Sequence, residues 1–211
     1  MTEVKREEHG LYQQKMFCFV HLTIQEYLAA LYVFHTFNTK GKNLFMGSTS
    51  GSSSLAASEF YKKAVDKALE SINGDWDLFL RFLLGLSVET NQVLLQELLK
   101  KTENYEKTYK ETVEYIKKKI REDISDPEKN LNLFHCLNEL NDHTLVQEIK
   151  KFLQSDTKIF ENFTTSQWSA LTYVLLTSEE KLDVFDLKKY LKSEKVLLGM
   201  LPVVKVSRSA L

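Results

Sequence analysis

Residues that interrupt helices are scarce in this chain, which has 2 prolines and 7 glycines among its 211 residues. A β-sandwich or barrel needs many short strands separated by turn residues, so this scarcity argues against an all-β fold. Leu, Lys and Glu are abundant instead, and they favour long helices. The hydrophobic share of 43% and the charged share of 27% are ordinary for a globular chain. We therefore predict a mainly α structure, a multi-helix bundle or solenoid-like domain with a sizeable core.

The chain also has few cysteines and almost no net charge. Cys18 and Cys136 are the only cysteines, and thiols so far apart indicate reduced core residues rather than a disulfide framework or a metal knuckle. The net charge of -1 gives no basic field for nucleic acid or for a membrane surface. No apolar run reaches the roughly 20 residues that span a bilayer, and the acidic N-terminus does not resemble a secretory signal. We expect a cytoplasmic protein.

The usual signatures of catalysis and metal binding are absent as well. Gly41-Lys42 lacks the G-x-x-x-x-G-K-[ST] pattern of a phosphate-binding loop, and no nucleophile elbow, paired-carboxylate site or dinucleotide fingerprint is present. His135, Cys136 and His143 lie close in sequence, but a fourth zinc ligand is missing. We therefore expect no catalytic residue, no metal ligand and no cofactor bound by this chain alone.

A β-hairpin is predicted near the N-terminus. Glu8-His9-Gly10 is typical of a turn, and residues 11–20 end in Met16–Val20, an aromatic and β-branched run typical of a strand. This strand has no obvious partner before it, and Val203–Val206 resembles the beginning of another strand that the chain does not complete. Together the two ends predict a piece excised from a longer protein.

A helix is predicted directly after this strand. Thr23–Glu26 reads as a capping box, in which the threonine hydroxyl caps the helix and the glutamate reaches back. His21 then lies between a strand and a helix N-terminus, where free amides and a partial positive charge favour an anion. From the residues alone His21 is either packed at the corner, the commoner case, or able to reach a phosphate. The predicted buried stripe consists of Ile24, Tyr27, Leu28, Leu31 and Phe34.

Successive helices are predicted after a flexible Gly/Ser loop at 39–58. The Lys117–Lys119 run is interleaved with glutamates, which indicates a solvated helix face rather than a nucleic-acid patch. Asn73-Gly74 predicts a left-handed stop, and Asp126-Pro127 a helix start. Apolar stripes or caps place the helices at 61–72, 76–86, 91–99, 100–123, 127–140, 142–152, 165–175, 185–191 and 194–201.

The segment Phe17–Tyr32, FCFVHLTIQEYLAALY, resembles the NOD-like receptor family, in which F-x-H-x-[ST]-[FI]-Q-E-[FY]-x-A-A closes the winged-helix domain. Trp76–Glu89 is similar to the second helical domain of these NACHT–LRR proteins. A similarity to the segment that precedes the leucine-rich repeats is seen at Trp168–Leu171, Asp186–Tyr190 and Leu201–Lys205. The sequence at Leu201–Lys205 resembles the subgroup of these receptors that is expanded in bony fishes.

The resemblance implies a domain division: 1–38 as the end of the winged-helix domain, 39–58 as a flexible loop, 59–195 as the second helical domain, and 196–211 as the start of the repeats. It also implies that His21 contacts the β-phosphate of ADP held by the upstream NACHT domain of the full-length parent. Exchange for ATP would release autoinhibition and let this innate immune receptor oligomerise as in an inflammasome. ADP and ATP would be ligands of the parent, because this chain lacks the phosphate-binding loop.

The partners implied are the NACHT domain and the repeats of the same receptor, with further copies on activation and no nucleic acid. The alternative is a standalone helical interaction module without a nucleotide link. A winged helix that binds nucleic acid is disfavoured by the near-neutral charge and by the apolar face of the predicted helix at 24–37.

Overall fold

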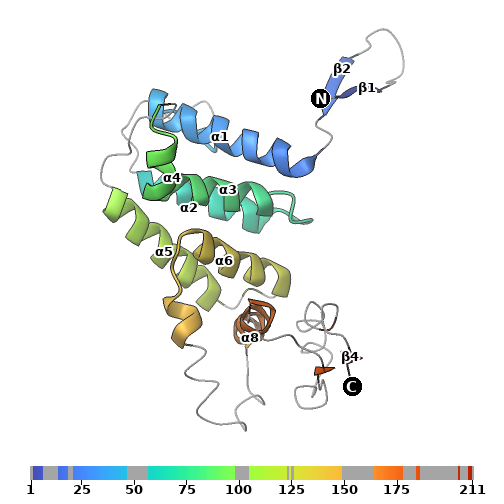
Figure 1. Ribbon diagram of the computed structural model, residues 1–211, viewed down its shortest axis with the longest axis vertical. Coiled ribbons are helices and arrows are strands. Elements are labelled where there is room, and N and C mark those ends of the chain that lie inside the picture. Colours follow the sequence, from blue (N-terminus) through green and yellow to red (C-terminus); the bar gives the residue numbers. More distant parts are fainter. Residues whose placement is uncertain are drawn as a thin grey trace.

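The computed structural model is built mainly of helices, which confirms the predicted α class (Figure 1). It describes residues 2–6, 14–18, 21–46, 57–97, 105–122, 124, 126–148, 164–177, 184–185, 204 and 209–210. The helices are α1 (Leu22–Lys40), α2 (Ala57–Glu70), α3 (Asp77–Ser87), α4 (Glu89–Leu94), α5 (Tyr105–Arg121), α6 (Pro127–Glu139) and α8 (Thr165–Thr177). Residues 144–148 are also helical. The strands are β1 (Thr2–Arg6), β2 (Gln14–Cys18), β3 (Val184–Phe185) and β4 (Ser209–Ala210).

The strand pairs lie near the two ends of the chain. β1 and β2 are antiparallel, with a register that runs from Thr2 opposite Cys18 to Arg6 opposite Gln14. The expectation that the strand within 11–20 has no partner before it is therefore wrong, because β1 precedes it and is paired along its whole length. β3 and β4 form a parallel pair of two residues each.

The predictions for the C-terminal part are either wrong or lie largely outside the described residues. The helix predicted at 185–191 is wrong at its first residue, because Phe185 is in β3. The rest of that helix, the helix at 194–201 and three residues of the strand at Val203–Val206 lie outside the described residues. The strand prediction is wrong at Val204, which is helical. Since a two-residue pair depends on its distant partner strand, no local pattern around Phe185 could have indicated it.

Helix α3 is the centre of the bundle. It packs against α1, α2, α4 and α6, while α6 in turn contacts α5 and α8. The sequence of α3, DLFLRFLLGLS, has only two charged residues, and this composition suits a helix that is surrounded by others. Figure 1 shows α1 and α3 together at one end of the bundle, with α5, α6 and α8 beyond them.

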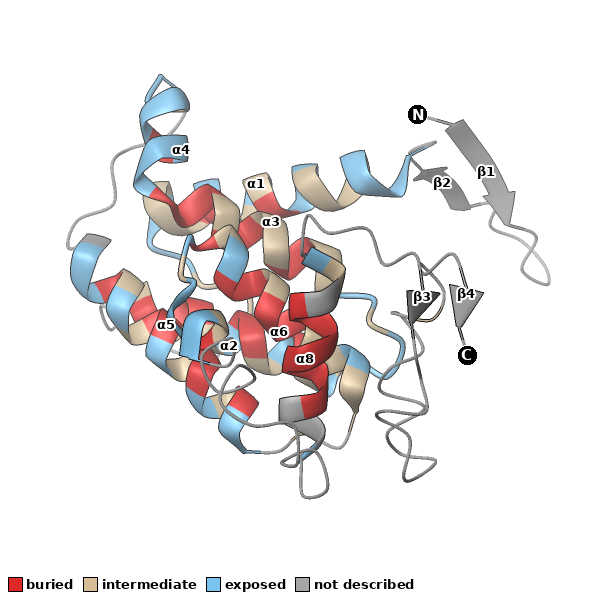
Figure 2. Cartoon of the chain, turned by 60° about the horizontal axis from the view of Figure 1, so that its bottom comes forward, coloured by how far each residue is buried: buried red, intermediate tan, exposed pale blue. Residues whose placement is uncertain are grey.

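The core is continuous from α1 to α6. Figure 2 shows the buried residues on the surfaces that the helices turn toward each other. Because several helices contribute to one cluster, burial of apolar area stabilises them jointly rather than one by one. The largest fully buried side chains are Phe34, Phe60, Val65, Leu80, Leu83, Leu84, Ile116, Leu133, Phe134, Leu137 and Leu140.

The predicted capping box is wrong, because α1 begins before Thr23. The N-cap is His21, whose φ of -110° and ψ of 117° are extended, and its side chain makes no capping hydrogen bond. The N–H of Gln25 donates to the carbonyl oxygen of His21 at 3.2 Å. Thr23 lies within the helix, and a residue with helical backbone angles does not serve as an N-cap.

The predicted loop at 39–58 is helical at both edges and anchored at its start. α1 continues to Lys40, and Gly41 caps it in the left-handed region (φ 62°), donating its N–H to the carbonyl of Phe37 at 2.9 Å. The Asn43 side chain then accepts the N–H of Phe45 at 2.9 Å. Phe45 packs on Phe60, with ring centroids 5.2 Å apart. Residues 47–56 lie outside the described part, and Ala57 already belongs to α2.

Two predicted helix boundaries are set by local chemistry. Gly74 has a φ of 69°, as the left-handed stop requires, although α2 itself ends at Glu70. Asp126 caps α6, accepting the N–H groups of Glu128 and Lys129 at 2.9 and 3.4 Å, with Pro127 in the first turn. The predicted start of α6 is confirmed.

Candidate functional site

His21 lies at an open corner of the structure. It is exposed and immediately precedes α1, a helix of 19 residues whose first turn has no acidic side chain. The N-terminus of a helix carries unpaired amides and about half a positive charge. A donor side chain and the positive end of a helix are therefore accessible at one point, which is the arrangement that binds an anionic group.

The outer face of α1, defined here as His21, Ile24, Leu28, Tyr32 and His35, continues from that corner. These residues recur every three or four positions, so they lie along one side of the helix. Ile24, Leu28 and Tyr32 are 48%, 40% and 63% exposed. Large apolar side chains that face solvent in a row are typical of a surface that a protein partner covers.

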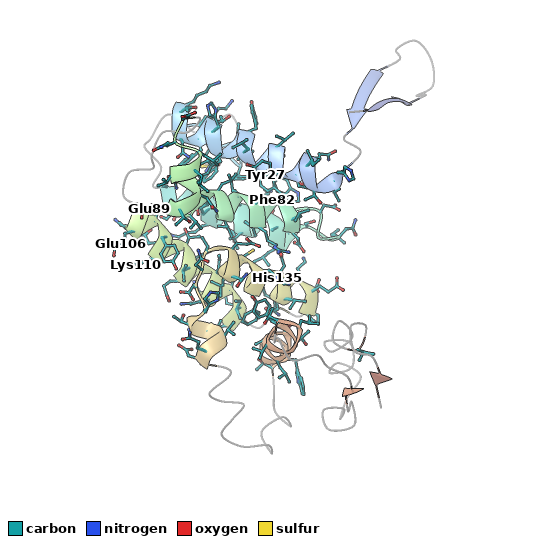
Figure 3. All side chains as sticks on the ribbon, in the orientation of Figure 1. Tyr27, Phe82, Glu89, Glu106, Lys110 and His135 are labelled. Atoms are coloured by element: carbon teal, nitrogen blue, oxygen red, sulfur yellow. The ribbon has the colours of Figure 1, made fainter. Side chains whose placement is uncertain are left out.

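The opposite side of α1 fixes the helix to the bundle. Ala30 and Phe34 are completely buried, and the ring of Tyr27 meets that of Phe82 on α3 edge to face, with centroids 5.5 Å apart (Figure 3). The predicted buried stripe is therefore split. Phe34 is in the core and Tyr27 is partly buried, whereas Ile24 and Leu28 are exposed, which corrects the prediction for these two residues. Because α1 is apolar on most sides, spacing alone does not identify the side that faces α3.

The remaining histidines and cysteines do not form a metal site in the described part of the chain. His135 packs edge to face on Tyr173 at 5.2 Å, and burial, with a contribution from Arg81, lowers its pKa. Cys136 is completely buried, and burial raises the pKa of its thiol. No group of three or more His, Cys, Asp or Glu residues there is arranged to hold a metal ion. His9 lies outside the described residues.

The lysine run on α5 is only partly the solvated face that was predicted. The side chain of Lys118 is 69% exposed, in agreement with it. Lys117 is buried, and its Nζ lies 3.1 Å from Asp142 Oδ1 and donates to Thr144 Oγ1 at 2.7 Å. The prediction is wrong for Lys117, because its partner is on the segment after α6 and no pattern within α5 indicates it.

A pocket of about 340 Å³ lies between α1, α3, α4 and α6. Arg81 and Glu139 pair at its wall, with Nη2 and Nε of the guanidinium 3.0 and 3.3 Å from the same oxygen, Glu139 Oε1. The sequence analysis did not identify this pair, because its members are 58 residues apart. The lining residues are Tyr27, Arg81, Phe82, Gly85, Leu86, Asn91, Leu94, Leu95 and Glu139.

Asp77 lies one turn before Arg81, where α3 meets α6, and its carboxyl should make the free energy of unfolding depend on pH. Burial raises the pKa of the Asp77 carboxyl from 3.8 to about 6, against the lowering effect of Lys129. The folded state thus binds more protons than the unfolded state between these pH values, so the free energy of unfolding should rise as the pH falls from about 7 to about 5. Asp77→Asn should remove this rise.

Urea unfolding of the wild type and of Asp77→Asn at several pH values measures the effect. Asp75→Asn is the matched control, because Asp75 is an exposed carboxylate in the preceding turn. If the free energies of unfolding of Asp77→Asn and of the wild type differed by the same amount at every pH from about 7 to about 5, Asp77 would not titrate in this range.

The described part of the chain is thus an α-helical bundle in which α1 leaves an apolar face open to solvent. No described helix is both long and apolar enough to cross a membrane. A family model described as NLRC4 helical domain HD2 matches residues 21–148, which is more than half of the chain. The chain belongs to this family of NOD-like receptor helical domains.

Relatives agree with this assignment. NLR family CARD domain-containing protein 3 of Homo sapiens is 29% identical over 199 residues, covering 93% of this chain and 18% of that protein. Protein NLRC3 of Mus musculus has the same identity and coverage. The chain therefore spans about a fifth of the length of these relatives. No solved structure matches it. The family match begins at residue 21 and so includes α1, whereas the division at residue 38 and the likeness to the bony-fish subgroup stay predictions.

Proposed function

We propose that this chain is a non-catalytic regulatory segment of a cytoplasmic innate immune receptor. In the full-length parent it couples the ADP or ATP state of an upstream NACHT domain to autoinhibition, and through it to oligomerisation. Residues 1–38 close the winged-helix domain, 59–195 form the second helical domain, and 196–211 begin the leucine-rich repeats. The two curated relatives are several times longer than this chain, which leaves room for these other domains.

The observation that carries the proposal is the two-sided character of α1. Its inner side is fixed in the core through Phe34 and through the contact of Tyr27 with Phe82. Its outer face presents Ile24, Leu28 and Tyr32 to solvent. A domain that docks on the outer face is therefore coupled to the whole bundle, because α1 is held by close packing to α3. The docking domain that we propose is the NACHT domain.

His21 supplies the link to the nucleotide in this proposal. Its side chain is exposed and makes no capping hydrogen bond, so it is able to donate to a phosphate oxygen. The amides at the start of α1 favour the same negative charge. The β-phosphate of ADP would hold the NACHT domain and α1 together, and a small displacement on exchange for ATP would break that contact. The bundle and the repeats would then move away with α1.

His21→Ala in the full-length receptor should raise basal signalling several-fold and reduce the ADP that co-purifies with it, because one contact of the closed state is lost. A reporter assay without ligand and chromatographic analysis of bound nucleotide measure the two effects. His143→Ala is the matched control, since His143 is an exposed histidine that lies outside α1. Unchanged basal signalling together with unchanged ADP retention would contradict the role of His21.

A further inference from the structure

The pocket between α1, α3, α4 and α6 is separate from His21 and has the properties of a ligand site. Its volume of about 340 Å³ lies in the range of small-molecule pockets. The rings of Tyr27 and Phe82 line it, and Leu94 and Leu95 add aliphatic surface. Leu94 is 81% exposed although it borders the pocket, so apolar area at the entrance remains uncovered. These walls suit a ligand with an apolar body.

The C-terminal ends of two helices lie at the pocket wall. Gly85 and Leu86 belong to the last turn of α3, and Glu139 is the last residue of α6. Each helix C-terminus carries about half a negative charge, which a basic residue in the last turn commonly offsets. Neither helix has such a residue, whereas α1 ends with Lys40. The Gly85 carbonyl at the end of α3 already accepts the N–H of Val88 and Nδ2 of Asn91, so the negative group that remains available to a ligand is the Glu139 carboxylate.

Hydrogen-bond acceptors face the same space. Both bonds from Arg81 go to Glu139 Oε1. The other oxygen, Glu139 Oε2, lies 3.9 Å from where a Cβ on Gly85 would be, on the pocket-lining side of α3. Asn91 also lines the pocket, and its Nδ2 is already engaged, donating to the Gly85 carbonyl at 2.7 Å. The carboxylate oxygen Oε2 and the amide oxygen of Asn91 are therefore the groups that a donor would meet.

We propose that this pocket binds an organic cation, an alkylammonium or guanidinium group carried on a short apolar body. The cation would donate to Glu139 Oε2 and lie against the rings of Tyr27 and Phe82, since aromatic faces attract cations. The apolar body would pack on Leu94 and Leu95. An anion of the same size would meet the Glu139 carboxylate, while the Arg81 guanidinium in the same wall is already engaged by that carboxylate. The inference goes beyond the role proposed for His21 and does not rest on it.

Two probes with the same phenylethyl body and opposite charge test the sign. Phenethylamine should shift the NMR signals of pocket residues of the 211-residue chain in a saturable way, and hydrocinnamate should not. Blocked lysine and arginine amides distinguish the source of the cation. If they bind as well, a side chain of another polypeptide is able to occupy the pocket; if only phenethylamine binds, the ligand is a free amine. Equal or tighter binding of hydrocinnamate would overturn the proposal.

Two variants test the location. Glu139→Gln should weaken phenethylamine about tenfold, through loss of a charge-assisted hydrogen bond. Glu106→Gln is the matched control, because Glu106 also pairs with a basic residue, Lys110 at 2.7 Å, but on α5 (Figure 3). Gly85→Met should abolish binding by filling the pocket while the urea transition is retained. Undiminished binding by Glu139→Gln and by Gly85→Met would place the amine elsewhere and overturn the proposal.

Discussion

Lys117→Met is expected to lower the free energy of unfolding by about 3–5 kcal/mol, because it removes one partner of a buried ion pair. The side chains of Lys117 and Asp142 are 10% and 11% exposed, and Nζ lies 3.1 Å from Oδ1 and 3.3 Å from Oδ2. Without the ammonium, the carboxylate keeps Thr144 as a neighbouring donor, whose Oγ1 and backbone N–H donate to Oδ1 at 2.8 and 3.3 Å. Two neutral donors on one oxygen do not compensate a buried charge. Urea unfolding followed by circular dichroism measures the loss.

Two further variants separate the ion pair from lysine in general. Lys118→Met changes the adjacent residue, whose side chain is 69% exposed and whose pair with Glu122 spans 3.7 Å, so it should cost at most about 1 kcal/mol. Adding Asp142→Asn to Lys117→Met should restore part of the stability, since the remaining group is then neutral. A loss with Lys117→Met as small as with Lys118→Met would show that Asp142 is solvated in solution.

The second large effect is expected for Phe60→Ala, with a loss of about 3–5 kcal/mol. Phe60 is completely buried at the start of α2. Its ring stacks on Phe37 with centroids 4.1 Å apart and lies 5.2 Å from Phe45 and 5.0 Å from Tyr61. The substitution opens a cavity between three rings that belong to α1, the segment after it and α2. Thermal and urea unfolding both report the loss.

Tyr32→Ala is the control for this substitution, because it also removes an aromatic ring from a helix. Tyr32 is 63% exposed on the outer face of α1, so its removal should change the free energy of unfolding by no more than about 0.5 kcal/mol. Comparable losses for the two variants would contradict the assignment of inner and outer surfaces, since both rings would then be buried in solution.

The sequence predicted those features that depend on neighbours along the chain. The start of α6 follows from Asp126-Pro127, where the cap side chain and the proline act within one turn. The left-handed turn at Gly74 likewise depends on a single residue. The signature around His21 was sufficient to indicate the family, because a motif of that length is specific. The cap of α1 was misplaced, since His21 and Thr23 are both reasonable starts and the extended backbone at His21 decides between them.

Features that join distant segments were not predictable in this way. The bond of Arg81 to Glu139 joins α3 to α6, and the ion pair of Lys117 joins α5 to Asp142 in the segment after α6. Phe45 lies in a stretch rich in glycine and serine, yet its contacts with Phe60 and Trp76 fix the first residues after α1. On α1 the apolar spacing was recognised, but which of its apolar sides meets α3 depends on the arrangement of the whole bundle. The candidate site at His21 was therefore predicted from the motif, and the outer face and the pocket were not.

The thiol of Cys136 has a practical consequence. It lies completely enclosed on α6, a helix that contacts α3, α5 and α8. An alkylating reagent reaches the sulfur only after α6 separates from its neighbours, and burial keeps the thiol from ionising until then. The rate of alkylation at this sulfur therefore measures how often the interior of the bundle opens. The measurement needs no added label, because the thiol belongs to the chain itself.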